Sequence, residues 1–212
     1  MQWSIIDVYS IEGKRLQSFG EKQKIIKFDY GVVKGMLPST TELTIFDGVL
    51  LPDKDYIYYL NHRFGTLVKF STSGDKVFET NITSLFGKNE LAKLTENKKL
   101  FLENGYDSFA KDRSIPRYSV FRSAKIAGDN IVILLDQWNY LESKLDSFIE
   151  IKVINKNDLK IVSTYHAAVS KDERLLNFSV NMEKELPIFF ILFTTEDGYK
   201  VYKYTPTQNR KI

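Results

Sequence analysis

Alternating apolar and polar residues run through the chain in short stretches that polar turns separate. In three places a strand-like stretch ends, a polar four-residue turn follows, and a second short alternating stretch begins. Glycine or aspartate closes each turn, as expected where the backbone takes a positive φ that β-branched residues avoid. The layout therefore predicts antiparallel hairpins that belong to a repeated unit. The three copies are VYSIEGKRLQSF at 8–19, KFSTSGDKVFET at 69–80 and VINKNDLKIVST at 153–164.

The repeated unit extends beyond the hairpin. Two further strand candidates precede it in most copies, so that each complete unit holds four consecutive antiparallel strands. A four-stranded meander of about 40–50 residues is typical of a propeller blade. The pattern predicts an all-β, propeller-like array with a half-blade at 1–24 and blades at 43–83, 118–167 and 175–212.

The strands inside a unit differ in their patterning. The second strands, YIYYL, NIVILL and IFFILF, are apolar almost throughout, which is typical of strands covered on both faces by neighbouring sheets. The longest apolar run, LPIFFILF at 186–193, is accordingly predicted to be buried on both faces. The third strands, such as IEIKV and YKVYKY, alternate apolar residues with Lys or Glu and are predicted to turn one face toward water.

One region interrupts the strands. Between 84 and 114, leucines at positions 85, 91, 94 and 100 are separated by Ala, Lys and Glu, which predicts a short helical insertion of one or two helices between two blades. Its charged part, KLTENKKLFLENG at 93–105, mixes both signs and is typical of a solvated face. Residues 21–42 are predicted to form a linker and a strand leading into the first complete blade.

The hydrophobic–aromatic–turn–Gly–Lys layout of VYSIEGKRLQSFG and KFSTSGDKVFET resembles the blades of six-bladed TolB-like and NHL-like β-propellers of exported bacterial proteins. The resemblance implies a propeller fold and a periplasmic or extracytoplasmic location, while propellers serve in binding, scaffolding and catalysis alike. Six blades of that size need more than 212 residues. We therefore expect about 3.5–4 blades in an open or incomplete ring, with a closed ring of four or five blades as the competing layout.

An open array leaves apolar blade faces and strand edges uncovered. We therefore expect a protein or carbohydrate ligand, and a homodimer through the exposed terminal blades. The 30 basic and 27 acidic residues are spread along the chain without a basic stripe, which argues against a nucleic-acid partner. The longest apolar run is too short to span a bilayer. The first residues lack a signal-peptide pattern, which favours the cytoplasm and leaves the location open against the exported setting of the family.

Loops that join second and third strands gather on one face of a propeller, around the central channel. Trp138 and Tyr140 on such a loop could stack on a sugar or grip a peptide, while charged neighbours orient it. The competing interpretation is that they are ordinary solvated loop residues. The predicted ligand-binding residues are Asn61, His62, Arg63, Asp136, Trp138, Asn139, Tyr140 and Glu196.

Candidate catalytic chemistry is sparse. His62 and His166 are the only histidines and have no metal-ligand spacing, and the chain has no cysteine and no GxSxG or Gly-rich phosphate motif. No metal or cofactor is therefore predicted. The acidic pairs Asp53–Asp55 and Asp172–Glu173 could serve calcium or glycosidase chemistry but are better explained as turn starts. We expect a non-catalytic binding or scaffold module. The alternatives are a propeller-based hydrolase or lyase acting on carbohydrate or peptide, and a fragment that functions only on assembly with another chain.

Overall fold

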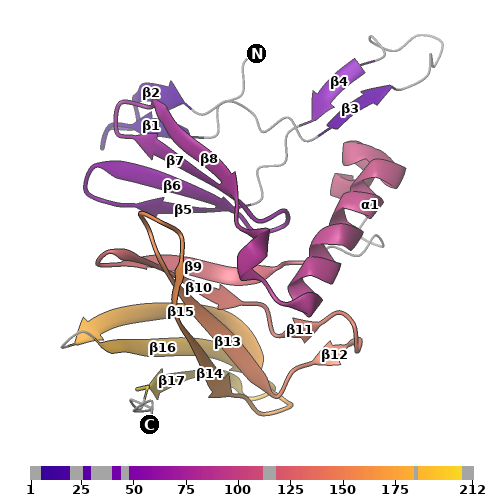
Figure 1. The fold of residues 1–212 in the computed structure, drawn as a ribbon, viewed down its shortest axis with the longest axis vertical. Coiled ribbons are helices and arrows are strands. Elements are labelled where there is room, and N and C mark those ends of the chain that lie inside the picture. Colours follow the sequence, from indigo (N-terminus) through magenta and orange to yellow (C-terminus); the bar gives the residue numbers. More distant parts are fainter. Residues whose placement is uncertain are drawn as a thin grey trace.

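The structure is a computed structural model that describes residues 6–19, 26–29, 40–43, 48–111, 118–183 and 186–206. Antiparallel sheets stack side by side, and one long helix lies against one side of the stack (Figure 1). Three of these sheets are meanders, which we call the first, middle and terminal meanders in chain order. Within the described ranges, no helix combines the length and apolarity needed to cross a membrane.

The first and middle meanders have four strands each, and the terminal one has three. The first comprises β5 (Gly48–Pro52), β6 (Tyr56–Asn61), β7 (Thr66–Ser71) and β8 (Lys76–Asn81). The middle comprises β9 (Phe121–Ala127), β10 (Asn130–Leu135), β13 (Phe148–Asn155) and β14 (Ile161–Ala168). The terminal comprises β15 (Arg174–Glu183), β16 (Leu186–Thr195) and β17 (Gly198–Tyr204).

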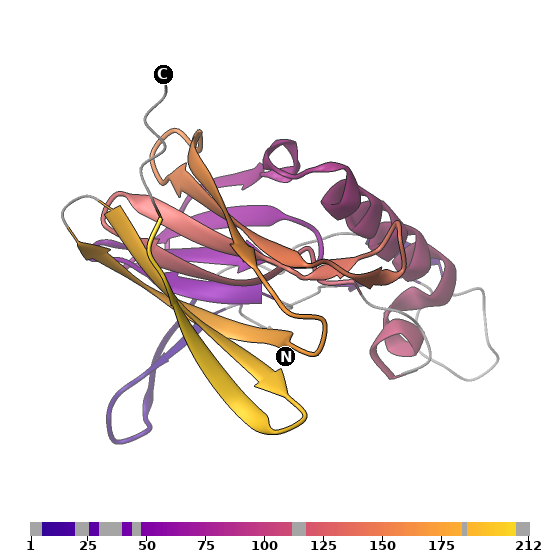
Figure 2. The same ribbon diagram turned by 90° about the horizontal axis from the view of Figure 1, so that it is seen from below.

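Three two-stranded hairpins and the helical region complete the described chain. The hairpins are β1 (Ile6–Tyr9) with β2 (Arg15–Phe19), β3 (Ile26–Asp29) with β4 (Thr40–Leu43), and β11 (Trp138–Asn139) with β12 (Lys144–Leu145). The helical region comprises η1 (Thr83–Leu85) and α1 (Lys88–Lys111). Figure 2, turned by 90°, again places α1 on one side of the stack, near the β11–β12 hairpin.

The three meanders are arranged as propeller blades. The first strand of the middle meander, β9, packs between β5 and β15, the first strands of the other two. Successive side chains of β10 pack alternately into two hydrophobic cores. Ile131 and Ile133 join the core shared with the first meander and α1, while Val132 and Leu134 join the core shared with the terminal meander. The described residues form an open array rather than a closed ring (Figure 1).

The all-β, propeller-like fold class and its helical insertion are confirmed, with three differences in detail. The insertion is one continuous helix, α1, preceded by a single 3₁₀ turn. The third strand β13 is largely buried rather than half-exposed, and its Lys152 pairs with Glu150 at 2.6 Å. The run LPIFFILF is buried at most positions of both faces, as predicted, and the prediction is wrong at Phe190, which is 38% exposed.

The predicted division of the chain into blades includes residues outside the described ranges. This applies to the half-blade at 1–24, to the linker at 21–42 and to the end of the blade at 175–212. The blade boundaries therefore stay a prediction, whereas the strand pairings within the three meanders are observed.

Candidate functional site

Helix α1 is anchored by its asparagines onto two of the loops predicted to bind a ligand. Near its start, the Asn89 amide donates to the Trp138 carbonyl at 3.3 Å and accepts from the Tyr140 backbone N–H at 2.7 Å. Two turns later, the fully buried Asn97 donates to the Arg63 carbonyl at 3.1 Å. The helix therefore bridges the β6–β7 turn and the loop that follows β10.

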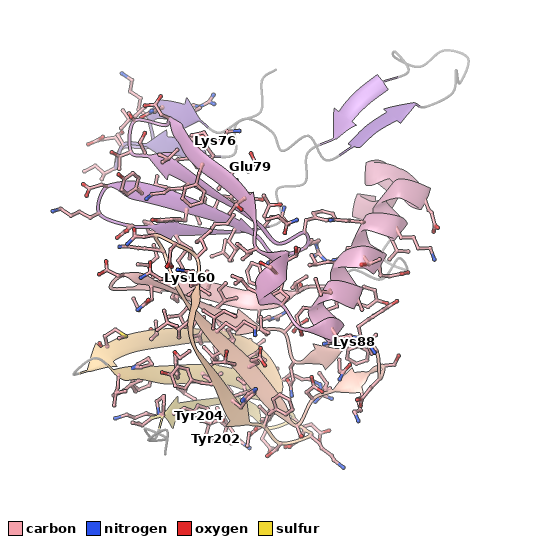
Figure 3. All side chains as sticks on the ribbon, in the orientation of Figure 1. Lys76, Glu79, Lys88, Lys160, Tyr202 and Tyr204 are labelled. Carbon is pink, nitrogen blue, oxygen red and sulfur yellow. The ribbon has the colours of Figure 1, made fainter. Side chains whose placement is uncertain are left out.

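A pocket of about 320 Å³ opens between the start of α1 and the end of β10. Five carboxylates line it, against one lysine, Lys88, which lies at the beginning of the helix (Figure 3). A surface this rich in carboxylates suits a positively charged group. The lining residues are Lys88, Asn89, Glu90, Leu135, Asp136, Asn139, Glu142, Asp146, Phe148 and Glu150.

A lysine is buried beside this acidic pocket. Lys93 on α1 has no exposed surface, and its Nζ donates to the Asp136 carbonyl at 3.4 Å. Burial lowers the pKa of the Lys93 ammonium, although Asp136, Glu90 and Asp146 attract a proton to it. The attraction of the nearby acidic residues thus offsets only part of the free-energy cost of removing this ammonium from water.

Asp136 shows the complementary shift. Burial raises the pKa of the Asp136 carboxyl, and the attraction of Lys93 and Arg122 does not cancel the effect. A carboxyl group with a raised pKa gains more from a nearby positive charge than one that water already stabilises. Burial is therefore the main cause of the Asp136 shift, and the neighbouring cations offset it only in part.

The other carboxylates of the pocket are better partnered. Glu150 pairs with Lys152 at 2.6 Å and contacts the His166 ring at 3.2 Å. Asp146 accepts a hydrogen bond from the Asn139 amide at 3.1 Å, and Glu142 pairs with Lys144. These contacts hold the rim of the pocket in place.

The structure places the predicted ligand-binding residues unequally. Asp136 and Asn139 line the acidic pocket. Trp138 and Tyr140 are half-buried next to them, and the Tyr140 ring lies edge-on to Tyr118 with centroids 4.4 Å apart. These four residues lie on one loop against the N-terminal part of α1.

The remaining four predicted residues lie elsewhere. Asn61 is fully buried, and its side chain accepts from the Arg63 and Phe64 backbone N–H groups at 2.9 and 3.0 Å, which closes the β6–β7 turn. His62 packs edge-on against Phe121, with ring centroids 5.7 Å apart. Glu196 is exposed on the β16–β17 turn and does not line the pocket.

Sequence reasoning missed Glu90, Lys93 and Asp146. Lys93 belongs to the charged stretch interpreted as a solvated face, and that interpretation is wrong for Lys93 because the side chain is fully buried. Asp146 follows the predicted binding loop closely and could have been included with it. Nothing in the sequence indicates which face of α1 meets the sheet ends.

The described residues contain no group of three or more His, Cys, Asp or Glu side chains arranged to hold a metal ion. No protein-family model matches the sequence, and no curated protein is significantly similar to it. The TolB-like and NHL-like resemblance, the six-bladed family and a bacterial origin therefore stay predictions.

Two solved structures show a weak likeness to this chain. A crystal structure of BBS1N in complex with ARL6DN, soaked with mercury, matches with a TM-score of 0.37 at 11% identity, over 80% of this chain and 37% of the matched chain. The same complex soaked with lead gives a TM-score of 0.36 at 9% identity, over 80% and 38%. This chain thus spans well under half the length of the chains it matches. The fold assignment rests on the strand pairing and packing described above.

Proposed function

We propose that the protein is a non-catalytic binding module that takes up a basic side chain of a protein partner in the acidic pocket. The observation that carries this proposal is the lining of the pocket, where five carboxylates converge and the half-buried Asp136 has a raised pKa that the neighbouring cations do not cancel. Hydrogen bonds between a cationic donor and a carboxylate are among the strongest that proteins make, and arginine can make two at once.

The size and the rim of the pocket fit such a ligand. Its volume of about 320 Å³ lies at the lower end of the range for ligand sites, which suits one side chain rather than a large cofactor. Trp138 and Tyr140 at its edge offer half-buried aromatic surface to the neighbouring peptide. Asp136 and Asn139 are proposed as direct contacts. Asn61, His62, Arg63 and Glu196 are not, because their positions lie outside the pocket.

The test is a titration of the full chain, labelled with ¹⁵N, with N-acetyl-arginine amide. We expect shifts at the Asn139 side-chain amide and around Asp146, and at least about tenfold weaker binding in Asp136→Asn, because a charged hydrogen bond is worth about 1.5–3 kcal/mol. N-acetyl-norleucine amide is the neutral control probe, and Asp172→Asn, at an exposed site away from the pocket, is the control variant. Equal binding of both probes, or none to either, would contradict the proposal.

A propeller-based hydrolase is the second candidate, and one observation favours it. The raised pKa of Asp136 beside other carboxylates is the combination that glycosidases use, with one carboxyl as acid and another as base or nucleophile. Hydrolysis of nitrophenyl glycosides by the intact protein, abolished in Asp136→Asn, would support this function over simple binding. Arginine-amide binding without any turnover would support the binding module.

A further inference from the structure

We infer a second binding site, independent of the acidic pocket, at the open edge of β17, where an extended strand of a partner protein completes the terminal meander. The first and middle meanders each end in a fourth strand, β8 or β14, paired with the third. Within the described residues, β17 is paired on one side only, with β16. An edge strand presents unpaired N–H and C=O groups that can template another strand.

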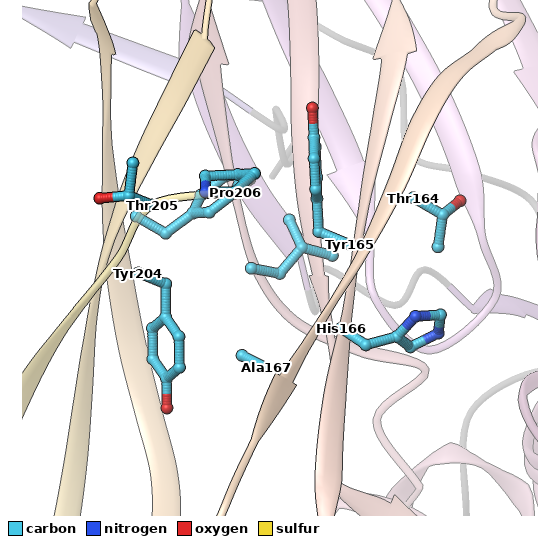
Figure 4. A pocket seen from close by; sticks show the side chains of 9 residues that line it. Thr164, Tyr165, His166, Ala167, Tyr204, Thr205 and Pro206 are labelled. Carbon is cyan, nitrogen blue, oxygen red and sulfur yellow. The ribbon is translucent and has the colours of Figure 1, made fainter. Parts of the chain in front are cut away.

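A cleft lies next to this edge. It has a volume of about 370 Å³ and separates β14, the outer strand of the middle meander, from the end of β17 (Figure 4). The Tyr204 hydroxyl crosses from β17 to donate to the Ala168 carbonyl at 2.9 Å. The Tyr165 ring lies 5.4 Å from the Phe189 ring, centroid to centroid. The lining residues are Ile151, Thr164, Tyr165, His166, Ala167, Phe189, Tyr204, Thr205 and Pro206.

The cleft lies where the other blades place a fourth-strand side chain. In the first meander, Phe78 on β8 is half-buried and packs on the core shared with the middle meander. In the middle meander, Tyr165 and Ala167 on β14 likewise pack on the core shared with the terminal meander. The described terminal meander offers no fourth strand to face them. The cleft therefore continues an established interface between sheets, and an apolar side chain on an added strand would extend it.

The chemistry of the occupant follows from its neighbours. It is an extended segment with apolar or aromatic residues at alternate positions, as in β8, and without proline at positions that must donate a hydrogen bond. The edge strand itself carries Lys200 and Lys203 and no acidic residue. Lys200 already lies 3.8 Å from the Glu173 carboxylate. Since opposite charges across a strand pair are favourable, the occupant should carry a carboxylate facing Lys203.

A second copy of the whole protein fits this edge poorly. The Tyr204 side chain reaches from β17 to the backbone of β14. Two copies paired edge to edge through β17 would bring Lys200 and Lys203 of one copy against the same lysines of the other, with no acidic residue on either strand to compensate. A single extended strand occupies the position of a fourth strand without that conflict. Of these two occupants, a strand segment of a partner protein fits this edge better.

The chain supplies a natural probe. The peptide DKVFETN, residues 75–81, contains the fourth strand of the first meander and carries one aromatic residue and two carboxylates. We expect it to bind the full ¹⁵N-labelled chain, to shift the amides of β17 and of Tyr165, and to slow hydrogen exchange at alternate β17 amides. The peptide DKVPETN, which lacks both the aromatic side chain and one backbone N–H, should bind at least about tenfold more weakly, because it loses the apolar contact with the cleft and a backbone hydrogen bond.

Two adjacent alanines of β14 provide matched variants. Ala167 is buried and lines the cleft, whereas Ala168 is exposed on the other face of the strand. Ala167→Phe should weaken DKVFETN binding by about tenfold or more, by filling the cleft, while Ala168→Phe should not. Thermal unfolding of both variants checks that each is folded. Asp136→Asn, which disables the acidic pocket, should leave DKVFETN binding unchanged, so failure of one site is distinguishable from failure of the other.

Three results would overturn this inference. The first is DKVFETN binding that does not involve β17. The second is DKVFETN binding that appears only in a chain shortened to end at Pro206. Residues 207–212 of the full chain would then be the segment that occupies the edge. The third is concentration-dependent self-association of the full chain that Ala167→Phe abolishes, because the occupant would then be a second copy.

Discussion

Lys156 Nζ lies 2.7 Å from the Asp53 carboxylate, although the two residues are 103 positions apart in the chain. The pair joins the β5–β6 turn to the β13–β14 turn and so connects the first meander to the middle one. Both side chains are largely buried, and Lys156 also donates to the Gly128 carbonyl at 3.1 Å. The hydrogen bond from Lys156 lowers the pKa of the Asp53 carboxyl and raises the pKa of the Lys156 ammonium.

Replacement of Asp53 should weaken the contact between these two meanders. We expect Asp53→Asn to lower the free energy of unfolding by about 1–3 kcal/mol, the usual contribution of a hydrogen bond to a charged group. Because the pKa of Asp53 is lowered by folding, its stabilisation is present above the unfolded value near 3.8 and is lost as pH falls through the folded value.

The measurement is urea unfolding of both proteins across acidic and neutral pH. The difference in unfolding free energy should stay constant between about pH 5 and pH 7 and shrink as the solution becomes more acidic. Asp129→Asn is the control, because Asp129 is 81% exposed and lies 3.6 Å from the same ammonium. A pH-independent difference, or an equal loss in the control, would contradict the assigned role.

Asn97 should be the most sensitive polar residue on α1. It is fully buried, donates to the Arg63 and Tyr118 carbonyls at 3.1 and 2.5 Å, and accepts from the Tyr118 N–H at 2.9 Å. Asn97→Ala should cost about 2–4 kcal/mol, because it leaves several buried backbone groups without partners. The exposed Thr95→Ala, on the same helix, should change stability by less than about 0.5 kcal/mol. Similar unfolding midpoints for the two variants would disprove this role for Asn97.

Most of the fold could be predicted because its signals are local. The turn ending at Gly74 and the apolar second strands identify hairpins and buried strands within a few residues, and β10 is buried on both faces as its composition predicts. The error at Phe190 has a different origin. An apolar run indicates that a strand can be covered on both faces, but whether a neighbouring sheet is present depends on the rest of the assembly.

The candidate site was predicted only in part. Asp136 and Asn139 lie on the connection between β10 and β13, where the sequence predicted them, and their role in binding stays a prediction. Glu90 and Lys93 come from a helix whose docking depends on tertiary contacts, chiefly the hydrogen bonds of Asn89 and Asn97 to distant backbone. A mixed-charge helix can turn either face inward, and its hydrophobic pattern is too weak to decide between them.

Close packing around Gly48 offers a third prediction. A Cβ atom at Gly48 would lie 2.5 Å from the Leu60 carbonyl oxygen and 2.6 Å from the Tyr59 ring. The backbone of β6 cannot give way as a side chain can, so Gly48→Ala should destabilise the protein by about 1–3 kcal/mol. Gly128→Ala is the control, with open space around its Cβ but a φ of +58°, and should cost about 1 kcal/mol. Thermal unfolding that ranks the control as the less stable variant would refute the steric argument.

The buried Lys93 and the half-buried Asp136 should prove coupled. In Lys93→Met, the pKa of Asp136 should rise further, since the largest attraction that opposes the effect of burial is removed. A raised carboxyl pKa means that the native state holds more protons, so stability falls as pH rises from the unfolded value of 3.8 through the folded one. This fall should extend to higher pH in Lys93→Met than in the parent protein.

The double variant Lys93→Met/Asp136→Asn completes the cycle. Replacement of both charged groups by uncharged groups of similar size should cost less stability than the sum of the two single replacements, with a coupling energy above about 0.5 kcal/mol. The measurement is chemical denaturation of all four proteins, with the Asp136 carboxyl titrated by ¹³C NMR. The exposed Lys99→Met is the matched control on the same helix and should leave the Asp136 titration unchanged. Additive single-variant effects would mean that Lys93 does not act on Asp136.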